Sequence, residues 1–256
     1  MKKKYGQNFL INKSIISKII ECAAINNKSI VYEVGPGDGS LTKEIVNKDP
    51  IKFICIEIDQ SLKKKLDIFF KKKNHELILK NVLNFNELDY FSKNAIIISN
   101  LPYNISLKLL IKWIYQYSSS QWYDSMILMF QKEVAERIIS KPNSKKFGRI
   151  TLLVSAYFHV EKVIDVNKNN FFPVPKVDSV VLKFTPLKKL HFTFNNLKKL
   201  ELLSNIFFSN KRKKLKNKIK KTFSLDIINK YSLDKFFDMR AENLEKELFF
   251  TLAKLL

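Results

Sequence analysis

The residues best suited to chemistry form the stretch Asn100-Leu101-Pro102-Tyr103, which follows the apolar run 95–98 and Ser99. A short apolar run that ends at a turn signal is typical of a buried strand in a parallel sheet, and ligands bind at the carboxyl edge of such sheets. There, the Asn100 side-chain oxygen and the Leu101 carbonyl can each accept one N–H of an exocyclic amine, which concentrates the nitrogen lone pair. The Tyr103 ring can stack on the base. This stretch therefore suits attack by the amino group of an adenine.

A structural interpretation of the same stretch stays open at this point. Asn100 can instead cap a helix that starts near Ile105, and Tyr103 can be a core residue. The choice between the two interpretations depends on the rest of the chain.

A second cluster is the loop Gly35-Pro36-Gly37-Asp38-Gly39, which follows a predicted strand at 30–34 and precedes a helix from about Leu41. Small residues there let the backbone approach a ligand at a helix N-terminus. The third glycine comes one residue earlier than the dinucleotide fingerprint requires. With Glu33 in front, the spacing resembles the first motif of S-adenosylmethionine-dependent methyltransferases. Because the chain has only five glycines, three in one loop favour a binding site.

Polar residues also lie at the ends of the next two predicted strands, 52–58 and 76–79. Glu57, about twenty residues past the loop, is placed to bind the ribose hydroxyls of an adenine nucleotide, and Asn81 is placed to touch the adenine. A structural alternative is a carboxylate that caps the turn at Ser61, a role that suits Asp59 better than Glu57.

The elements that must position these residues alternate between strands and helices up to residue 186. This alternation predicts an α/β fold, Rossmann-like, with a mostly parallel sheet and an antiparallel final strand. Three strands, at 150–156, 158–164 and 177–184, are expected to close the sheet. The prolines around Phe171 favour a stiff loop that places its ring over the base opposite Tyr103, although a core position is the alternative.

From about residue 187 the pattern becomes purely helical, so we expect a catalytic domain at 1–186 and a small all-α domain at 187–256. The segment 211–221 holds eight basic residues, among them Arg212, Lys213 and Lys214. We expect a helix over 211–223 that faces phosphates. With Lys4, these residues are the predicted contacts to RNA.

The composition indicates a polyanionic partner and argues against several other classes. Lys and Arg total 46 against 24 acidic residues, a formal charge of +22, which favours nucleic acid. Only four of the 46 are arginine, in a chain whose lysine excess also fits compositional drift. Two widely spaced cysteines and three scattered histidines indicate neither a disulfide framework nor a metal site. Without an apolar segment long enough to cross a membrane, or a signal peptide, we expect a cytoplasmic monomer.

Taken together, the chain resembles the ribosomal RNA adenine dimethyltransferase family over essentially its full length. The matching stretches are Gly6-Gln7-Asn8-Phe9-Leu10, Glu33-Val34-Gly35-Pro36-Gly37, Asn100-Leu101-Pro102-Tyr103-Asn104-Ile105-Ser106, Gln131-Lys132-Glu133-Val134, Pro142-Asn143-Ser144-Lys145, Gly148-Arg149, Pro175-Lys176-Val177-Asp178-Ser179 and Met239-Arg240-Ala241-Glu242-Asn243.

The resemblance implies an activity and roles for residues. It implies dimethylation of two adjacent adenines near the 3′ end of 16S ribosomal RNA in the assembling small subunit, with S-adenosylmethionine as methyl donor and no metal. Asn8 and Leu10 would fold over the donor, and Gly35 would face its amino-acid part. Glu57 would bind its ribose, while Asn100 would serve both donor and target amine.

One position departs from the family pattern. The family usually has Asp where this chain has Asn81, which is expected to weaken donor binding by about 1 kcal/mol or less.

Three other functions compete with this one. An RNA-binding assembly factor without turnover would keep the fold and lose the chemistry. A 23S ribosomal RNA methyltransferase usually reads Asn-Ile-Pro-Tyr and lacks the Asn-Ser-Lys loop, so Leu101 and residues 142–149 favour the small-subunit enzyme. A DNA adenine methyltransferase would have Asp-Pro-Pro-Tyr or Asn-Pro-Pro-Tyr, which this chain does not have.

Overall fold

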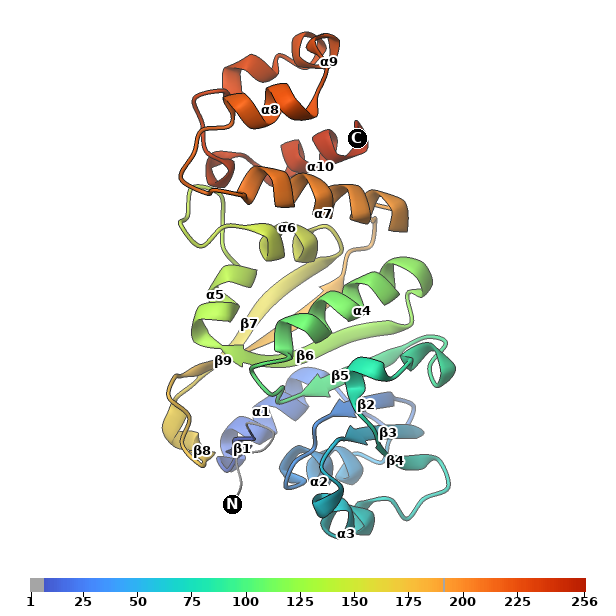
Figure 1. Cartoon of the computed structure of the whole chain (residues 1–256). Helices are drawn as coiled ribbons and strands as arrows, with labels where there is room; N and C mark the ends of the chain where they lie inside the picture. The colour runs from blue at the N-terminus through green and yellow to red at the C-terminus, as the bar shows by residue number, and fades with distance from the viewer. Residues whose placement is uncertain (1–6, 191) are drawn as a thin grey trace. The chain divides into compact units, whose positions relative to one another are not determined.

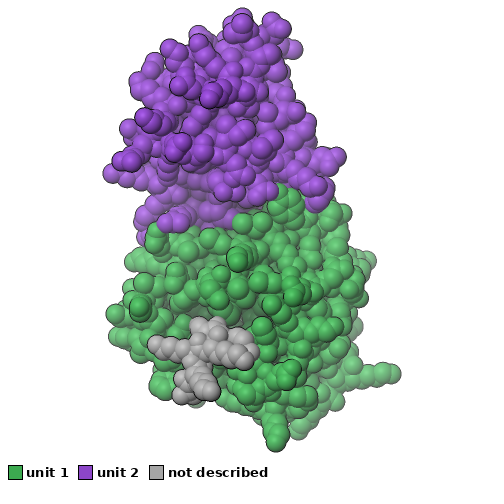
Figure 2. Space-filling model, in the orientation of Figure 1, with its two compact units in different colours: residues 1–135, 159–186 green, residues 136–158, 187–256 purple. Residues whose placement is uncertain are grey.

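The computed structural model describes residues 7–190 and 192–256. The chain divides into two compact units (Figure 2): unit 1 comprises residues up to 135 together with 159–186, and unit 2 comprises 136–158 and 187–256.

Unit 1 is built on a seven-stranded sheet with the order β4-β3-β2-β5-β6-β9-β7 (Figure 1). Strands β2 to β6 pair in parallel, and β9 pairs antiparallel with β6. The fold class expected from the sequence is therefore confirmed. The strands are β2 (Ile30–Val34), β3 (Lys52–Glu57), β4 (His75–Leu79), β5 (Ala95–Ser99), β6 (Tyr123–Gln131), β7 (Phe158–Val166) and β9 (Ser179–Pro186).

The strand order creates a place for a ligand. The chain passes outward from β2 through β3 to β4 and then returns to β5, on the other side of β2. Connections that leave β2 and β5 in opposite directions open a crevice at their carboxyl ends. The glycine loop follows β2 and Asn100 follows β5, so both reach this crevice.

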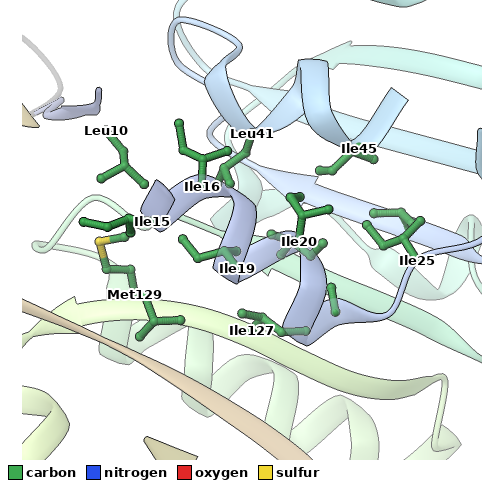
Figure 3. Close-up of a cluster of buried hydrophobic side chains, with 14 of the residues drawn as sticks. Leu10, Ile15, Ile16, Ile19, Ile20, Ile25, Leu41, Ile45, Ile127 and Met129 are labelled. Carbon is green, nitrogen blue, oxygen red and sulfur yellow. The ribbon is translucent and has the colours of Figure 1, made fainter. Parts of the chain in front are cut away.

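Helices cover the sheet because their apolar residues recur on one side. The Asn12 side chain caps α1 (Lys13–Ala23) by accepting from the Ser14 and Ile15 backbone N–H groups at 3.0 and 3.2 Å. Figure 3 shows the buried isoleucines of α1 between α2 (Ser40–Asn47) and strand β6. The remaining helices up to residue 138 are α3 (Lys63–Leu66), α4 (Ser106–Ser120) and α5 (Lys132–Ile138).

A second, two-stranded sheet pairs β1 (Phe9–Leu10) with β8 (Phe171–Phe172). The strands are antiparallel, with Phe9 opposite Phe172 and Leu10 opposite Phe171. This pairing ties the N-terminal segment to a loop more than 150 residues away.

Unit 2 is helical around an aromatic core in which the rings of Phe147, Phe207 and Phe208 lie near Phe249. Its helices are α6 (Arg149–Ser155), α7 (Phe194–Phe208), α8 (Lys216–Thr222), α9 (Leu225–Lys230) and α10 (Lys246–Lys254).

The strand predicted at 150–156 is wrong, because this segment is helix α6. A short apolar run cannot be assigned to strand or buried helix from periodicity alone. Here Leu152, Leu153 and Val154 are all buried, and α6 packs on α7. Consequently 136–158 groups with the helical unit, whereas the predicted boundary left it in the first domain.

The helix predicted over 211–223 is also shorter than expected. Asn210 has a φ of +49°, and the Leu215 and Lys216 backbone N–H groups donate to the carbonyls of Met239 and Phe237. Since these bonds replace the first helical ones, α8 begins only at Lys216. Across the described residues, every helix is too short or too polar to cross a membrane.

Candidate active site

The glycine loop bends sharply and lies under the N-terminal segment. Gly37 has a φ of +57°, and a Cβ atom placed there would lie 2.8 Å from Cε1 of the Phe9 ring. A larger residue would therefore be strained and would displace Phe9. Gly35, predicted to face the donor, has a φ of +68° and lines a cavity at the carboxyl edge of the sheet.

Glu57 holds this loop in place. The Glu57 carboxylate accepts N–H groups from Gly37 at 3.2 Å and from Ile58 and Asp59 at 2.8 Å. Burial raises the pKa of Glu57, and the three backbone donors oppose that shift. A carboxylate has about four acceptor positions, so a ribose hydroxyl remains compatible with these bonds. Asp59 caps the next turn at Ser61, as the structural alternative held.

A second carboxylate, Glu33, lies beneath the loop and was not among the predicted site residues. Its side chain is 1% exposed and accepts from the Thr42 hydroxyl at 2.8 Å. Burial raises the pKa of Glu33 to about 8, although the hydrogen bonds from Thr42 and Cys55 oppose the shift. The only sequence signal for it was an acidic residue two positions before the first glycine.

Asn81 lies at the end of β4 and lines the cavity. Its side-chain oxygen accepts the Leu83 backbone N–H at 3.0 Å and thereby caps a short 3-10 helix, Val82–Asn84. The amide therefore shapes the loop at the predicted adenine position.

The Asn100 side chain is oriented by the N-terminal segment. Its Nδ2 donates to the Asn8 backbone carbonyl at 3.0 Å, so the acceptor atom Oδ1 is the other end of the amide. Helix α4 has Ile105 as its N-cap and no side-chain capping bond. The alternative in which Asn100 caps this helix is therefore wrong.

Tyr103 is fixed at its hydroxyl, which lies 2.7 Å from Ser179 Oγ at the start of β9. Burial raises the pKa of Tyr103 above its usual value, while the hydrogen bond with Ser179 opposes the shift. The ring remains partly exposed and lines the cavity, whereas the adjacent Leu101 side chain is 1% exposed. No sequence pattern indicated the Ser179 contact, because the two residues are 76 positions apart.

These residues enclose one cavity of about 270 Å³. It is lined by segments from the N-terminal lead and from the carboxyl ends of four parallel strands. Of the predicted site residues, the cavity brings together Asn8, Leu10, Gly35, Glu57, Asn81, Asn100, Leu101 and Tyr103.

Phe171 does not match its prediction. Its side chain is 1% exposed, belongs to the hydrophobic core with Leu10, and is not among the cavity-lining residues. Side chains alternate between the two faces of a strand, so β8 turns Phe171 inward and Phe172 outward. The core alternative therefore describes Phe171 in this structure.

The predicted RNA contacts belong to a different part of the chain. Arg212, Lys213 and Lys214 are exposed residues of unit 2 that precede α8. Lys214 Nζ lies 2.8 Å from Asp238 Oδ1. Lys4 lies outside the described residues.

Comparisons with known proteins agree with one another. The family described as ribosomal RNA adenine dimethylase matches residues 1–256. A ribosomal RNA small subunit methyltransferase A from Pelagibacter ubique is 39% identical over 99% of this chain and 95% of its own length. Its counterpart from Mycoplasmopsis pulmonis is 40% identical over 98% and 97%.

Solved structures give the same result. A dimethyladenosine transferase from Plasmodium falciparum aligns with a TM-score of 0.80 and 30% identity, covering 95% of both chains. A 23S rRNA methyltransferase aligns with a TM-score of 0.72 and 21% identity over 96% of this chain and 98% of its own, and shows a shared fold.

Proposed function

This chain belongs to the ribosomal RNA adenine dimethylase family, and on that premise we propose that it dimethylates adenines of small-subunit ribosomal RNA. The proposed targets are the exocyclic amines of two adjacent adenines near the 3′ end of 16S RNA, with S-adenosylmethionine as donor. The observation that carries the proposal is the orientation of the Asn100 amide, whose Nδ2 is held by the Asn8 carbonyl. That contact leaves the acceptor oxygen for the substrate.

The cavity suits a cationic adenine nucleoside. Glu57 and Asp38 line it, so two acidic side chains face a site where a sulfonium must bind. Glu57 would bind the ribose and Gly35 would face the amino-acid part, while Asn8 and Leu10 would cover the donor. The loop beginning at Asn81 would hold the adenine.

In the proposed reaction the adenine amine forms a bond to the methyl carbon as the carbon–sulfur bond breaks. The Asn100 Oδ1 atom and the Leu101 carbonyl accept the two N–H groups, which localises the lone pair on nitrogen. Tyr103 stacks on the base and holds it in reach. Sulfur leaves as a neutral thioether, and the ammonium product releases its proton to solvent, so no general base is needed.

The substrate places further demands on the protein. The base must leave its stack to enter the cavity, and cations such as Arg212 and Lys213 would fix the register through phosphates. The proposal locates the protein with assembling small subunits in the cytoplasm.

The test is product analysis. The protein is incubated with isotopically labelled S-adenosylmethionine and unmethylated small subunits, and the digested RNA is examined by mass spectrometry. We expect labelled dimethyladenosine at two adjacent positions near the 3′ end of the 16S RNA. Binding to subunits without any methylated nucleoside would instead indicate an assembly factor, and methylation confined to 23S RNA would indicate the other branch of the family.

A further inference from the structure

Exposed apolar side chains gather at the small β1–β8 sheet and the segment that follows it. Phe172 is 61% exposed, Val174 57%, Ile11 56% and Val177 42%. All four belong to unit 1. Large exposed apolar residues that cluster, rather than occur singly, mark a surface for a partner.

Strand pairing explains why two of these side chains, Phe172 and Ile11, point outward. Leu10 and Phe171 are opposite each other and are only 2% and 1% exposed, so this face of the sheet packs into the core. Phe9 and Phe172 form the other pair, and alternation places them on the opposite face. The Ile11 backbone N–H donates to the Asn170 carbonyl at 2.9 Å, which extends the same register by one residue.

The outward face continues directly from the donor cavity. Phe9 lines that cavity and its ring approaches Gly37. The preceding residue, Asn8, accepts the hydrogen bond that orients Asn100. An aromatic surface therefore runs from Phe9, beside the reacting groups, to its exposed cross-strand neighbour Phe172.

Lysines outnumber acidic residues next to this face along the chain, where the one carboxylate, Asp178, accepts the Lys168 backbone N–H at 2.9 Å. Lys13, Lys168 and Lys176 are exposed and lie within four residues of Ile11 or Phe172 along the chain. Surfaces that bind single-stranded nucleic acid combine aromatic side chains, on which bases stack, with cations along the backbone path. A base stacked on one aromatic side chain does not need a closed pocket.

We propose that the outward face of β1–β8, centred on Phe172, is a stacking platform for an unpaired RNA base that neighbours the adenine in the cavity. This rests on the proposed function, which requires two adjacent adenines to be modified. While one adenine occupies the cavity, its neighbour must remain unpaired just outside. The platform would hold that neighbour and the three lysines would contact the adjoining phosphates.

The first test measures equilibrium binding of the full chain to unmethylated small subunits. Because a stacked base contributes substantially to binding, Phe172→Ala is expected to raise the Kd about tenfold, while Phe172→Trp stays within about twofold of the wild type. The matched control is Ile68→Ala, at a side chain that is 59% exposed elsewhere in unit 1. Equal Kd values for Phe172→Ala and Ile68→Ala would overturn the platform.

The second test identifies what lies on the face. A benzophenone amino acid in place of Phe172 is irradiated in the complex with small subunits. We expect a crosslink to a 16S nucleotide beside a target adenine, whereas a crosslink to a ribosomal protein, or none, would overturn the proposal. If the wild type forms no dimethyladenosine, the proposed function fails, yet these binding and crosslinking results still decide the platform.

Discussion

At the scale of single residues, the protonation of Glu33 makes the free energy of unfolding depend on pH. This carboxyl is buried under the glycine loop, where it accepts from Thr42, and its pKa rises from 4.5 to about 8. In the unfolded chain it loses its proton near its ordinary pKa, so between these two values the folded state binds more protons. The free energy of unfolding therefore falls as the pH rises through this window.

The variant Glu33→Gln tests this coupling. Glu33 is expected to lower the free energy of unfolding by up to about 1.4 kcal/mol per pH unit between pH 5 and 7.5. Glu33→Gln should remove that slope, as measured by urea unfolding across the pH range. The exposed Glu76→Gln serves as control. If the free energy of unfolding changed with pH in the same way for the wild type and Glu33→Gln, the raised pKa of Glu33 would be contradicted.

Tyr103 separates the contribution of a ring from that of its hydroxyl. The hydroxyl bonds to Ser179 while the ring lines the cavity. Loss of one hydrogen bond costs about 1 kcal/mol, so Tyr103→Phe should methylate within about fivefold of the wild type. Loss of stacking should make Tyr103→Ala about 10- to 100-fold slower in kcat/KM for subunits. Equal losses of kcat/KM in both variants would show that methylation depends on the hydroxyl and not on the ring.

At the scale of elements, a buried network connects helix α4 to the loop after β4. Lys112 Nζ donates to the Val82 carbonyl at 2.8 Å and to the Phe85 carbonyl, and it lies 2.8 Å from Glu87. The Glu87 side chain is fully buried and also accepts from Trp113 at 2.8 Å. Val82 lines the cavity, so this network holds the cavity wall at the proposed adenine position.

Removing the cation from this network should affect both stability and donor binding. Lys112→Met leaves Glu87 without its charge partner, which is expected to cost about 3 kcal/mol of stability. The Kd for S-adenosylmethionine, measured by calorimetry below the unfolding transition, should rise several-fold. Lys108→Met, at an exposed position one turn earlier on α4, is the control. An unchanged Kd for the donor in Lys112→Met would show that the network does not support donor binding.

The sequence was most informative where a motif ended a strand. Gly35 and Asn100 each follow a parallel strand and Glu57 is the last residue of one. Because strand ends meet at one edge, their common cavity was predictable. Contacts between residues far apart in the sequence, such as the one between Tyr103 and Ser179, were not predictable. Phe171 was misplaced because its segment was predicted as a loop, whereas its pairing with Leu10 in the β1–β8 sheet turns the ring toward the core.

At the scale of the whole molecule, the arginines are unevenly distributed between the two units. All four arginines, Arg137, Arg149, Arg212 and Arg240, belong to unit 2. In a chain that uses lysine so freely, arginine is expected where a planar fork is needed. This distribution supports the proposal that unit 2 contacts RNA phosphates, while unit 1 holds the cavity proposed for the methyl donor.

Salt dependence tests this division. With a net charge of +22, binding to small subunits should weaken steeply with ionic strength, and each lost phosphate contact should reduce the slope of log K against log salt by about one. Arg212→Ala and Lys213→Ala should show this change. Lys214→Ala should change less because of its ion pair with Asp238, and Lys72→Ala, paired with Asp49 in unit 1, should not change it. Identical slopes in all four variants would contradict the assignment.

The most direct test of the central claim is the single-turnover rate of dimethyladenosine formation by Asn100→Ala, with donor and enzyme in excess over unmethylated small subunits. Loss of a group that polarises the amine in the transition state predicts a fall of at least about a hundredfold, with the Kd for subunits within about threefold of the wild type. Asn47→Ala, on the exposed end of α2, should match the wild type in both. A single-turnover rate for Asn100→Ala close to that of the wild type would contradict the account.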